Sequence, residues 1–374
     1  MRIVVAPDSF KESMTAEAAA AAMARGVLRV VPDAECVLVP MADGGEGTTD
    51  ALIAALGATR RTAKVRDALG RPISADYGLS RAGLAVLEVA AAVGIGLIAT
   101  EERDVLRSDS RGVADLVLDA LDAGATRLLI GLGGSATTDG GAGLLAGLGA
   151  GFLDATGTPV RTDPDGLTRL ARVDLAGLDR RIAGLEINLA SDVTNPLLGP
   201  NGAAAVFGPQ KGATAAQVPV LDATLARVAD ALVVAGLPDV RELPGAGAAG
   251  GLGLAFLALG ARLRPGVEVV ADAVGLEQAI QGADLVLTGE GSLDAQTAAG
   301  KTPAGVLAVA RRHQVPVLAF AGRVRSGSEE LGFSACVPIV EESVDLATAL
   351  REGEINLELA VARTLAHWLR GDAG

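Results

Sequence analysis

The sequence predicts an α/β protein with a doubly wound parallel sheet in one domain and a second α/β domain inserted into it. Short β-branched segments alternate with alanine-rich helical segments, and several of the short segments run straight into glycine-rich loops. Half of the residues are hydrophobic but only 2% are aromatic, so the core must be built from Ala, Val, Leu and Ile. With 374 residues, the chain is long enough for two domains.

The two ends of the chain predict the parallel sheet. Ser13 or Thr15 can cap the first helix, and Gly57 can end the second. Two strand–loop–helix units in succession imply a doubly wound parallel sheet. The strands are expected at residues 2–6, 37–39, 285–288, 315–321 and 335–338, and helices at about 15–30, 49–56, up to 312 and 355–369.

The middle of the chain has a different pattern. Residues 59–89 alternate between polar and apolar side chains, which predicts two or three antiparallel strands. Ser110 can cap a following helix, and further strands are expected at 128–130 and 186–190. We therefore predict a discontinuous parallel-sheet domain and an inserted α/β domain with a mixed sheet, at residues 1–58 with 284–374 and at residues 59–283.

Composition argues against several classes of protein. The formal net charge of −13 disfavours nucleic-acid binding, which needs a basic surface. The uncharged stretch at 243–261 approaches the length of a membrane span, but its six glycines and one proline predict a loop and a buried helix. Cys36 and Cys336 are the only cysteines, so we expect no disulfide framework, no zinc site and a reducing, cytoplasmic environment. No secretion signal is evident.

The most informative stretch is IGLGGSATTDGGAG, at residues 130–143. A strand, a glycine-rich turn and a helix in succession present backbone N–H groups to an anion, and the hydroxyls add further donors. The stretch also matches a dinucleotide fingerprint with alanine last, but a lone match is weak evidence. The residues expected to bind phosphate groups are Gly133, Gly134, Ser135, Ala136 and Thr137.

Other predicted strands end in loops that combine glycine with acidic, amide or basic side chains. Because the carboxyl ends of parallel strands share one edge of a sheet, we expect these loops to form a site. Their carboxylates suit magnesium better than acid–base hydrolysis, and roughly half of them must serve as caps or structural pairs. The carboxylates are Asp43, Glu46, Asp139, Asp192, Glu290 and Asp294.

A second near match is a phosphate-loop pattern at residues 295–302. It carries alanine at its first glycine and starts several residues after its predicted strand, so only Lys301 is retained as a phosphate contact. His313 and His367 are expected in surface or packing roles, which disfavours a histidine-based triad.

Six motifs, in this order along the chain, resemble the signatures of the type-1 glycerate kinase family of bacteria: APDSFKES, PMADGGEGT, GGSATTDGGAG, ASDVTNPLLG, GPQKGA and TGEGSLDAQTAAGKTP. The resemblance implies ATP- and magnesium-dependent phosphorylation of D-glycerate, with 2-phosphoglycerate as the expected product. It also implies two α/β domains with an active site in the cleft between them. Three residues depart from the family pattern: Glu12 replaces an expected glycine, Thr138 an asparagine and Ser292 a larger residue.

Chemistry suggests a role for each candidate residue, because phosphoryl transfer depends mainly on positioning and charge neutralisation. Asp192 is expected to be the general base, with Asp8 as the alternative. Lys11 and Ser9 are candidates to bind the glycerate carboxylate, and Lys211 and Lys301 to balance the transferred charge. Further substrate contacts are expected from Asn195, Glu290 and Asp294, phosphate contacts also from Gly44 and Gly45, and magnesium ligation from Asp43 or Asp139.

Two other functions remain open from the residues alone. A nicotinamide-dependent oxidoreductase acting on a small hydroxy acid would bind NADH tightly and would not turn over ATP. A non-enzymatic binding protein would bind a small acid without needing magnesium. Beyond nucleotide and D-glycerate, we expect neither nucleic-acid nor membrane partners, and we allow for a homodimer.

Overall fold

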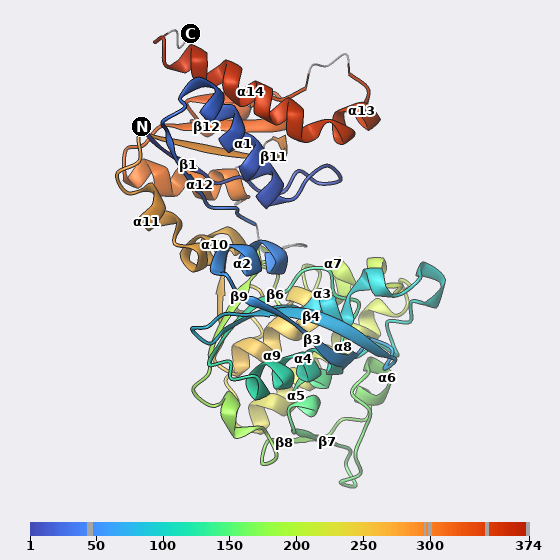
Figure 1. The fold of residues 1–374 in the computed structure, drawn as a ribbon. Helices are drawn as coiled ribbons and strands as arrows, with labels where there is room; N and C mark the ends of the chain where they lie inside the picture. Colours follow the sequence, from blue (N-terminus) through green and yellow to red (C-terminus); the bar gives the residue numbers. More distant parts are fainter. Residues whose placement is uncertain (43–47, 295–296, 298–300, 341–343, 372–374) are drawn as a thin grey trace. The chain divides into compact units, whose positions relative to one another are not determined.

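The computed structural model describes residues 1–42, 48–294, 297, 301–340 and 344–371 (Figure 1). The chain divides into two compact units. Unit 1 consists of Met1–Asp43, Asp50–Gly57 and Val267–Gly374, and unit 2 consists of Gly44–Thr49 and Ala58–Gly266. In this division the segment 267–283, which the sequence analysis assigns to the inserted domain, belongs to unit 1.

Unit 1 contains a five-stranded sheet in which every neighbouring pair is parallel. The strand order is β13-β12-β11-β1-β2, so β1 pairs with β2 on one side and with β11 on the other. This is the doubly wound arrangement that the ends of the sequence predict. The strands are β1 (Arg2–Val5), β2 (Glu35–Leu38), β11 (Leu285–Leu293), β12 (Val317–Val324) and β13 (Ala335–Pro338).

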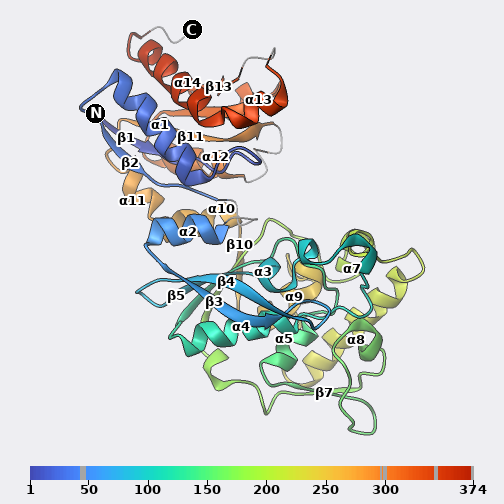
Figure 2. The same ribbon diagram turned by 45° about the vertical axis from the view of Figure 1, so that its right-hand side comes forward.

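Helices cover both faces of this sheet. Figures 1 and 2 show α1 and α14 on one side of β11 and β12, with α12 on the other. The first face has a core in which Ile3 and Phe320 pack with Met23 of α1 and Leu357 of α14. The Thr15 hydroxyl caps α1 by accepting from the Ala18 N–H, as predicted. The helices are α1 (Ala16–Val30), α2 (Thr48–Leu56), α10 (Gly266–Val274), α11 (Leu276–Ile280), α12 (Thr302–Arg312), η7 (Ser328–Leu331), α13 (Leu346–Arg351) and α14 (Gly353–Trp368).

Unit 2 contains a six-stranded mixed sheet with the order β10-β9-β6-β5-β4-β3. The pairs β3–β4 and β4–β5 are antiparallel, which confirms the prediction for residues 59–89, whereas β5, β6, β9 and β10 run parallel. The antiparallel pair β7–β8 stands apart from this sheet. The strands are β3 (Thr59–Arg66), β4 (Pro72–Leu79), β5 (Leu84–Glu88), β6 (Arg127–Gly131), β7 (Gly151–Leu153), β8 (Arg172–Asp174), β9 (Glu186–Ala190) and β10 (Arg262–Arg264).

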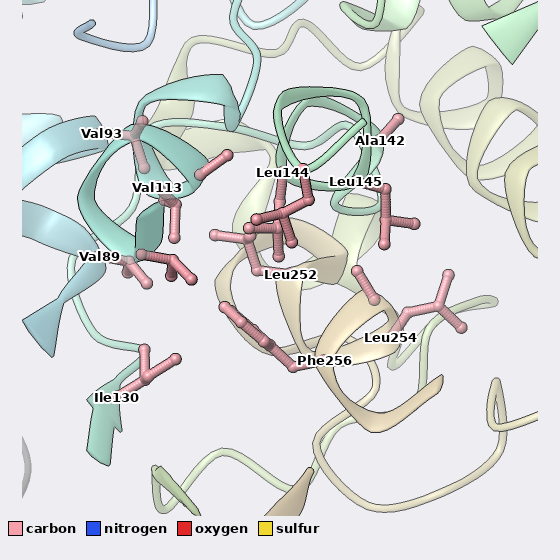
Figure 3. Close-up of a cluster of buried hydrophobic side chains, with 14 of the residues drawn as sticks. Val89, Val93, Val113, Ile130, Ala142, Leu144, Leu145, Leu252, Leu254 and Phe256 are labelled. Atoms are coloured by element: carbon pink, nitrogen blue, oxygen red, sulfur yellow. The ribbon is translucent and has the colours of Figure 1, made fainter. Parts of the chain in front are cut away.

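The core of unit 2 joins alternate residues of these strands to apolar helix faces. Figure 3 shows Leu144 of α5 beside Leu252 and Phe256 of α9, with Val113 of α4 close by. The helices are α3 (Val89–Val93), η1 (Ile95–Leu97), η2 (Thr100–Glu102), α4 (Arg111–Asp122), α5 (Ala142–Gly147), α6 (Pro164–Leu167), η3 (Arg180–Ile182), α7 (Ala203–Phe207), η4 (Pro209–Lys211), α8 (Val218–Val234), η5 (Ala248–Gly251) and α9 (Leu252–Ala258).

The structure agrees with the sequence prediction for residues 243–261 and differs from the one for the strand at 285–288. The uncharged stretch at 243–261 contains η5 and the buried helix α9, and no helix within the described residues could cross a membrane. In contrast, the strand expected at 285–288 continues to Leu293, because Gly289, Glu290 and Ser292 pair with β12. Glu290 therefore lies in a strand and not in the loop that the sequence predicts.

Candidate active site

Unit 1 has a topological switch point at β1 and β11. From β1 the strand order proceeds to one side through β2 and to the other through β11, β12 and β13. In parallel sheets, ligands bind outside the carboxyl ends of the strands at such a reversal. The Asp8 N–H donates to the Gly289 carbonyl over 2.8 Å. The Thr288 hydroxyl donates to the Ala6 carbonyl over 2.8 Å, so the two strand ends are joined where the rule locates a ligand.

Asp8 lies just beyond β1, and both of its carboxylate oxygens accept hydrogen bonds. Oδ1 accepts from the Ser9 N–H over 2.6 Å, and Oδ2 accepts from the Thr302 hydroxyl over 2.5 Å. Thr302 is fully buried and is the first residue of α12. The positive end of this helix favours a negative charge on Asp8. The two donors hold the carboxylate in one orientation.

Glu290 is a buried acid at the same edge of unit 1. The residue is 8% exposed, and its Oε1 accepts from the Thr297 hydroxyl over 2.6 Å. Burial raises the pKa of Glu290 to about 7. The Thr297 hydrogen bond and the Lys301 ammonium oppose this increase, whereas the charges of Asp8 and Asp294 add to it. Glu290 can therefore hold or release a proton near neutral pH.

Lys301 stands between two carboxylates of unit 1. Its Nζ is 3.8 Å from Glu290 Oε2 and 4.0 Å from Asp294 Oδ1. It is also the residue that precedes α12, eight positions after β11 ends. β11 ends at Leu293, two positions before the phosphate-loop pattern begins at residue 295, so the separation between strand and pattern on which its rejection rested is absent in this structure. Glu290, Asp294 and Lys301, predicted from one stretch of sequence, do come together.

Ser9 and Lys11 follow Asp8 in a tight turn. The Phe10 N–H donates to the Met14 carbonyl over 3.0 Å and the Met14 N–H donates back to the Phe10 carbonyl over 2.9 Å. This turn holds Glu12 at φ +63°, a left-handed conformation that glycine adopts without strain. Glu12 is where the family pattern has glycine, so the backbone explains that preference. Lys11 is exposed. Asp43, Gly44, Gly45 and Glu46 lie outside the described residues.

In unit 2 the glycine-rich loop follows β6 as predicted, but part of its backbone is already used. The Ala136 N–H donates to the Val93 carbonyl over 2.8 Å, and the Gly134 carbonyl accepts from the Ile95 N–H over 2.8 Å. The expectation that the Ala136 N–H binds phosphate is therefore wrong in this structure. Gly133 and Gly134 are exposed at the tip of the loop. Residues 135–140 are buried.

Lys211 lies beneath this loop. Its Nζ donates to the Ser135 hydroxyl over 2.9 Å and to the Thr137 carbonyl over 2.7 Å, and the residue is only 3% exposed. Burial lowers the pKa of Lys211 to about 7, although the negative charge of Asp139 opposes the decrease. Its buried position differs from that of a lysine that meets substrate directly.

Asp139 is fully buried and serves as an anchor within unit 2. Oδ2 accepts from the N–H and hydroxyl of Ser110 over 2.8 and 2.7 Å and from the Gly143 N–H over 2.9 Å. Oδ1 accepts from the Gly141 N–H over 3.2 Å. Burial raises the pKa of Asp139 to about 6, an effect that Asp109 increases and the hydrogen bonds reduce. These donors occupy the oxygens that a metal would need.

Asp139 therefore does not fit the magnesium role expected from the sequence. Magnesium keeps several water ligands and needs open coordination positions, which a carboxylate without exposed surface cannot supply. Among the described residues, no group of three or more His, Cys, Asp or Glu side chains is arranged to hold a metal ion. Ser110 also differs from expectation, since its hydroxyl bonds to Asp139 instead of capping α4.

Asp192 follows β9 by two residues and is exposed. Its Oδ1 accepts from the Gly266 N–H over 3.2 Å. The Asn195 amide, in contrast, donates to the Asn201 carbonyl over 2.8 Å, so it closes its own loop. Of this predicted pair, Asp192 is the residue whose side chain is open to solvent.

Several residues that the sequence predictions do not include in the site hold its candidate side chains in place. Thr297 and Thr302 donate to Glu290 and Asp8, and Ser110 donates to Asp139. Glu88, at the end of β5, accepts from the Thr49 N–H over 2.8 Å. Two of these residues could have been found from the sequence, because Thr302 adjoins Lys301 and Glu88 ends a predicted strand.

Comparisons with known proteins agree with the resemblance in the motifs. The model of the glycerate kinase family matches residues 3–369. A glycerate 2-kinase from Escherichia coli K12 is 44% identical, with 99% of each chain covered, and a glycerate kinase from Halalkalibacterium halodurans is 45% identical, with 97% covered. A crystal structure provisionally described as glycerate kinase 2 from Salmonella typhimurium LT2 superposes with a TM-score of 0.93 at 42% identity, and the match covers 100% of this chain and 99% of that one.

These matches extend over nearly the whole chain and agree in sequence and in fold. The protein therefore belongs to the glycerate kinase family.

Proposed function

We propose that the protein transfers the γ-phosphoryl group of ATP to D-glycerate in a magnesium-dependent reaction, giving 2-phosphoglycerate and ADP in the cytoplasm. The observation that carries the proposal is the set of acidic residues, a lysine and helix α12 at the β1–β11 switch point, in a chain whose relatives are named glycerate kinases. Phosphoryl transfer needs such positioned charges more than a covalent intermediate.

Asp192 is the proposed general base. The attacked hydroxyl needs an acceptor for its proton, and Asp192 combines exposure with an oxygen oriented by the Gly266 N–H. Asp8 is the alternative. Its two bound donors, the Ser9 N–H and the Thr302 hydroxyl, hold the carboxylate in a fixed orientation.

The remaining roles follow from charge. Lys11 and Ser9 bind the glycerate carboxylate, and Lys301 balances negative charge beside Glu290 and Asp294, which contact substrate. Gly133 and Gly134, the exposed glycines of the loop after β6, let a phosphate approach the backbone closely. Gly44 and Gly45, which lie outside the described residues, are kept as further phosphate contacts from the sequence. Asp43 is the candidate magnesium ligand.

A coupled assay of ADP release tests the proposal. We expect release with D-glycerate and magnesium, and none when magnesium is chelated or when 3-hydroxypropanoate, which lacks the 2-hydroxyl, replaces glycerate. ADP release at the same rate with and without D-glycerate, or no ADP release under any of these conditions, would refute the assignment. The relatives are named kinases, so neither alternative raised by the sequence is carried further.

A further inference from the structure

We propose that Lys211 is a positioning residue, which acts on a bound phosphate only through the Ser135 hydroxyl and the loop that it holds. This inference rests on the proposed phosphate-binding role of the loop after β6. It replaces the direct charge-balancing role that the sequence suggests for Lys211.

The ammonium group of Lys211 is directed into the loop after β6. Lys211 is 3% exposed, and two of its three hydrogens are directed to Ser135 Oγ and the Thr137 carbonyl. Ser135 is hardly more exposed, at 4%, but it directly follows the exposed Gly134, whereas Lys211 reaches the loop from a distant segment of the chain. A buried ammonium that bonds to two points of one loop fixes the path of that loop.

The Ser135 hydroxyl accepts from Lys211 and can still donate. A serine hydroxyl has one hydrogen and two lone pairs. One lone pair accepts from Lys211, which is its partner among the described residues, so the hydrogen remains available to an acceptor. A bond from a cation polarises the hydroxyl and strengthens this donor. Ser135 directly follows the exposed glycines, where a phosphate oxygen would meet it.

The next hydroxyls in the loop belong to Thr137 and Thr138. Thr137 Oγ1 and Thr138 Oγ1 are buried, and neither has a hydrogen-bond partner among the residues described. Buried polar groups are normally paired, so unpaired ones need a reason. Both threonines are 0% exposed, so of the three hydroxyls only that of Ser135 adjoins the exposed glycines, and its hydrogen is the one offered to a ligand.

The chain contains so few lysines that chemical labelling can follow each of them separately. Only four of the 32 basic residues are lysines, namely Lys11, Lys64, Lys211 and Lys301. Acetylation by acetic anhydride, followed by mass spectrometry, can therefore report on every lysine. Lys64 is exposed on β3 of the same unit and serves as the internal control.

We expect Lys211 to be acetylated at least about tenfold more slowly than Lys64, both without ligand and with magnesium–ATP, because the buried amine has little access to reagent. Labelling of Lys211 as fast as that of Lys64 would overturn the proposal, whether or not ATP protects it.

A double-mutant cycle tests whether Lys211 acts on a bound phosphate through the Ser135 hydroxyl. Calorimetry would give the Kd for magnesium–ATP in wild type, Ser135→Ala, Lys211→Met and the double variant, with Lys64→Met as the matched control. Loss of one charge-assisted hydrogen bond should weaken binding about tenfold in each single variant. If Lys211 acts through Ser135, the affinity of the double variant for magnesium–ATP should also fall about tenfold, and no further.

A loss of about a hundredfold in the double variant would instead show two independent contacts and overturn the proposal. Thermal unfolding checks that each variant is folded, and Lys211→Gln replaces Lys211→Met if the latter is not. Wild-type binding of magnesium–ATP tests the proposed function separately. If the wild-type protein does not bind magnesium–ATP, the proposed nucleotide is wrong. If it binds but the losses of affinity in the two single variants multiply in the double variant, only the proposed role of Lys211 is wrong.

Discussion

The Thr302 hydroxyl donates a hydrogen bond to Asp8 Oδ2 over 2.5 Å, and this contact joins the first residue of α12 to the chain just beyond β1. The two residues are 294 positions apart in the sequence. Because Thr302 is fully buried, water cannot easily replace its hydroxyl. The contact therefore controls the orientation of the carboxylate at the switch point of unit 1.

Thr302→Val should lower kcat about tenfold, since it preserves the shape of the side chain but removes the donor that orients Asp8. Thr302→Ser retains the hydroxyl and should restore most of the activity. Steady-state kinetics with D-glycerate, alongside thermal unfolding, measures both effects. An unchanged kcat in the valine variant would remove Asp8 from the reaction.

Glu290 predicts a pH dependence of stability. Its pKa is raised from 4.5 to about 7 in the folded protein, so the folded state binds more protons than the unfolded state between these values. The free energy of unfolding should therefore fall as pH rises from 4.5 to 7, by on the order of 2–3 kcal/mol from this residue.

Glu290→Gln cannot titrate and should lack this component. Thermal unfolding of both proteins from pH 4.5 to 7.5 should show the variant gaining stability relative to wild type as pH increases. Parallel pH profiles would contradict the raised pKa of Glu290.

The left-handed backbone at Glu12 predicts a stabilising substitution. A side chain at φ +63° costs about 1–2 kcal/mol, whereas glycine costs about 0.5–1 kcal/mol through the greater entropy of the unfolded chain. Glu12→Gly should thus raise the free energy of unfolding by up to about 1 kcal/mol. Glu12→Ala retains Cβ and is the matched control; equal stability of the two variants would argue against strain at this position.

Asp192→Asn tests the proposed base. The asparagine oxygen can still accept from the Gly266 N–H, so the loop should remain folded, but the side chain no longer takes up a proton. We expect ADP release to fall by at least about a thousandfold. If Asp192→Asn retains activity and Asp8→Asn does not, the base is Asp8.

Much of the fold could be predicted because strand and helix patterns are local. The strand at 186–190 matches β9 at both ends, and Thr15 caps α1 as its residue type suggests. The extension of β11 through Glu290 was missed because its Gly-Glu-Gly sequence is typical of a turn. Pairing with β12 overrides that local preference.

The side-chain contacts of the site depend on long-range geometry and could not be read from the motifs. Asp139 and Lys211 both occur in glycine-rich segments that look like surface loops, yet both are buried. Asp139 is paired with Ser110, 29 residues earlier, and Lys211 with Ser135, 76 residues earlier. The motifs therefore assigned these two residues to ligands, whereas in the structure their side chains bind other groups of the protein.

Phosphorus NMR of the product made by wild-type protein from D-glycerate, ATP and magnesium tests the central claim most directly. We predict a new phosphomonoester signal split into a doublet, since the phosphorus of 2-phosphoglycerate couples to the single proton on its carbon. A triplet, from the two protons of a phosphorylated primary alcohol, would contradict transfer to the 2-hydroxyl. The lack of any new phosphomonoester would contradict the account as a whole.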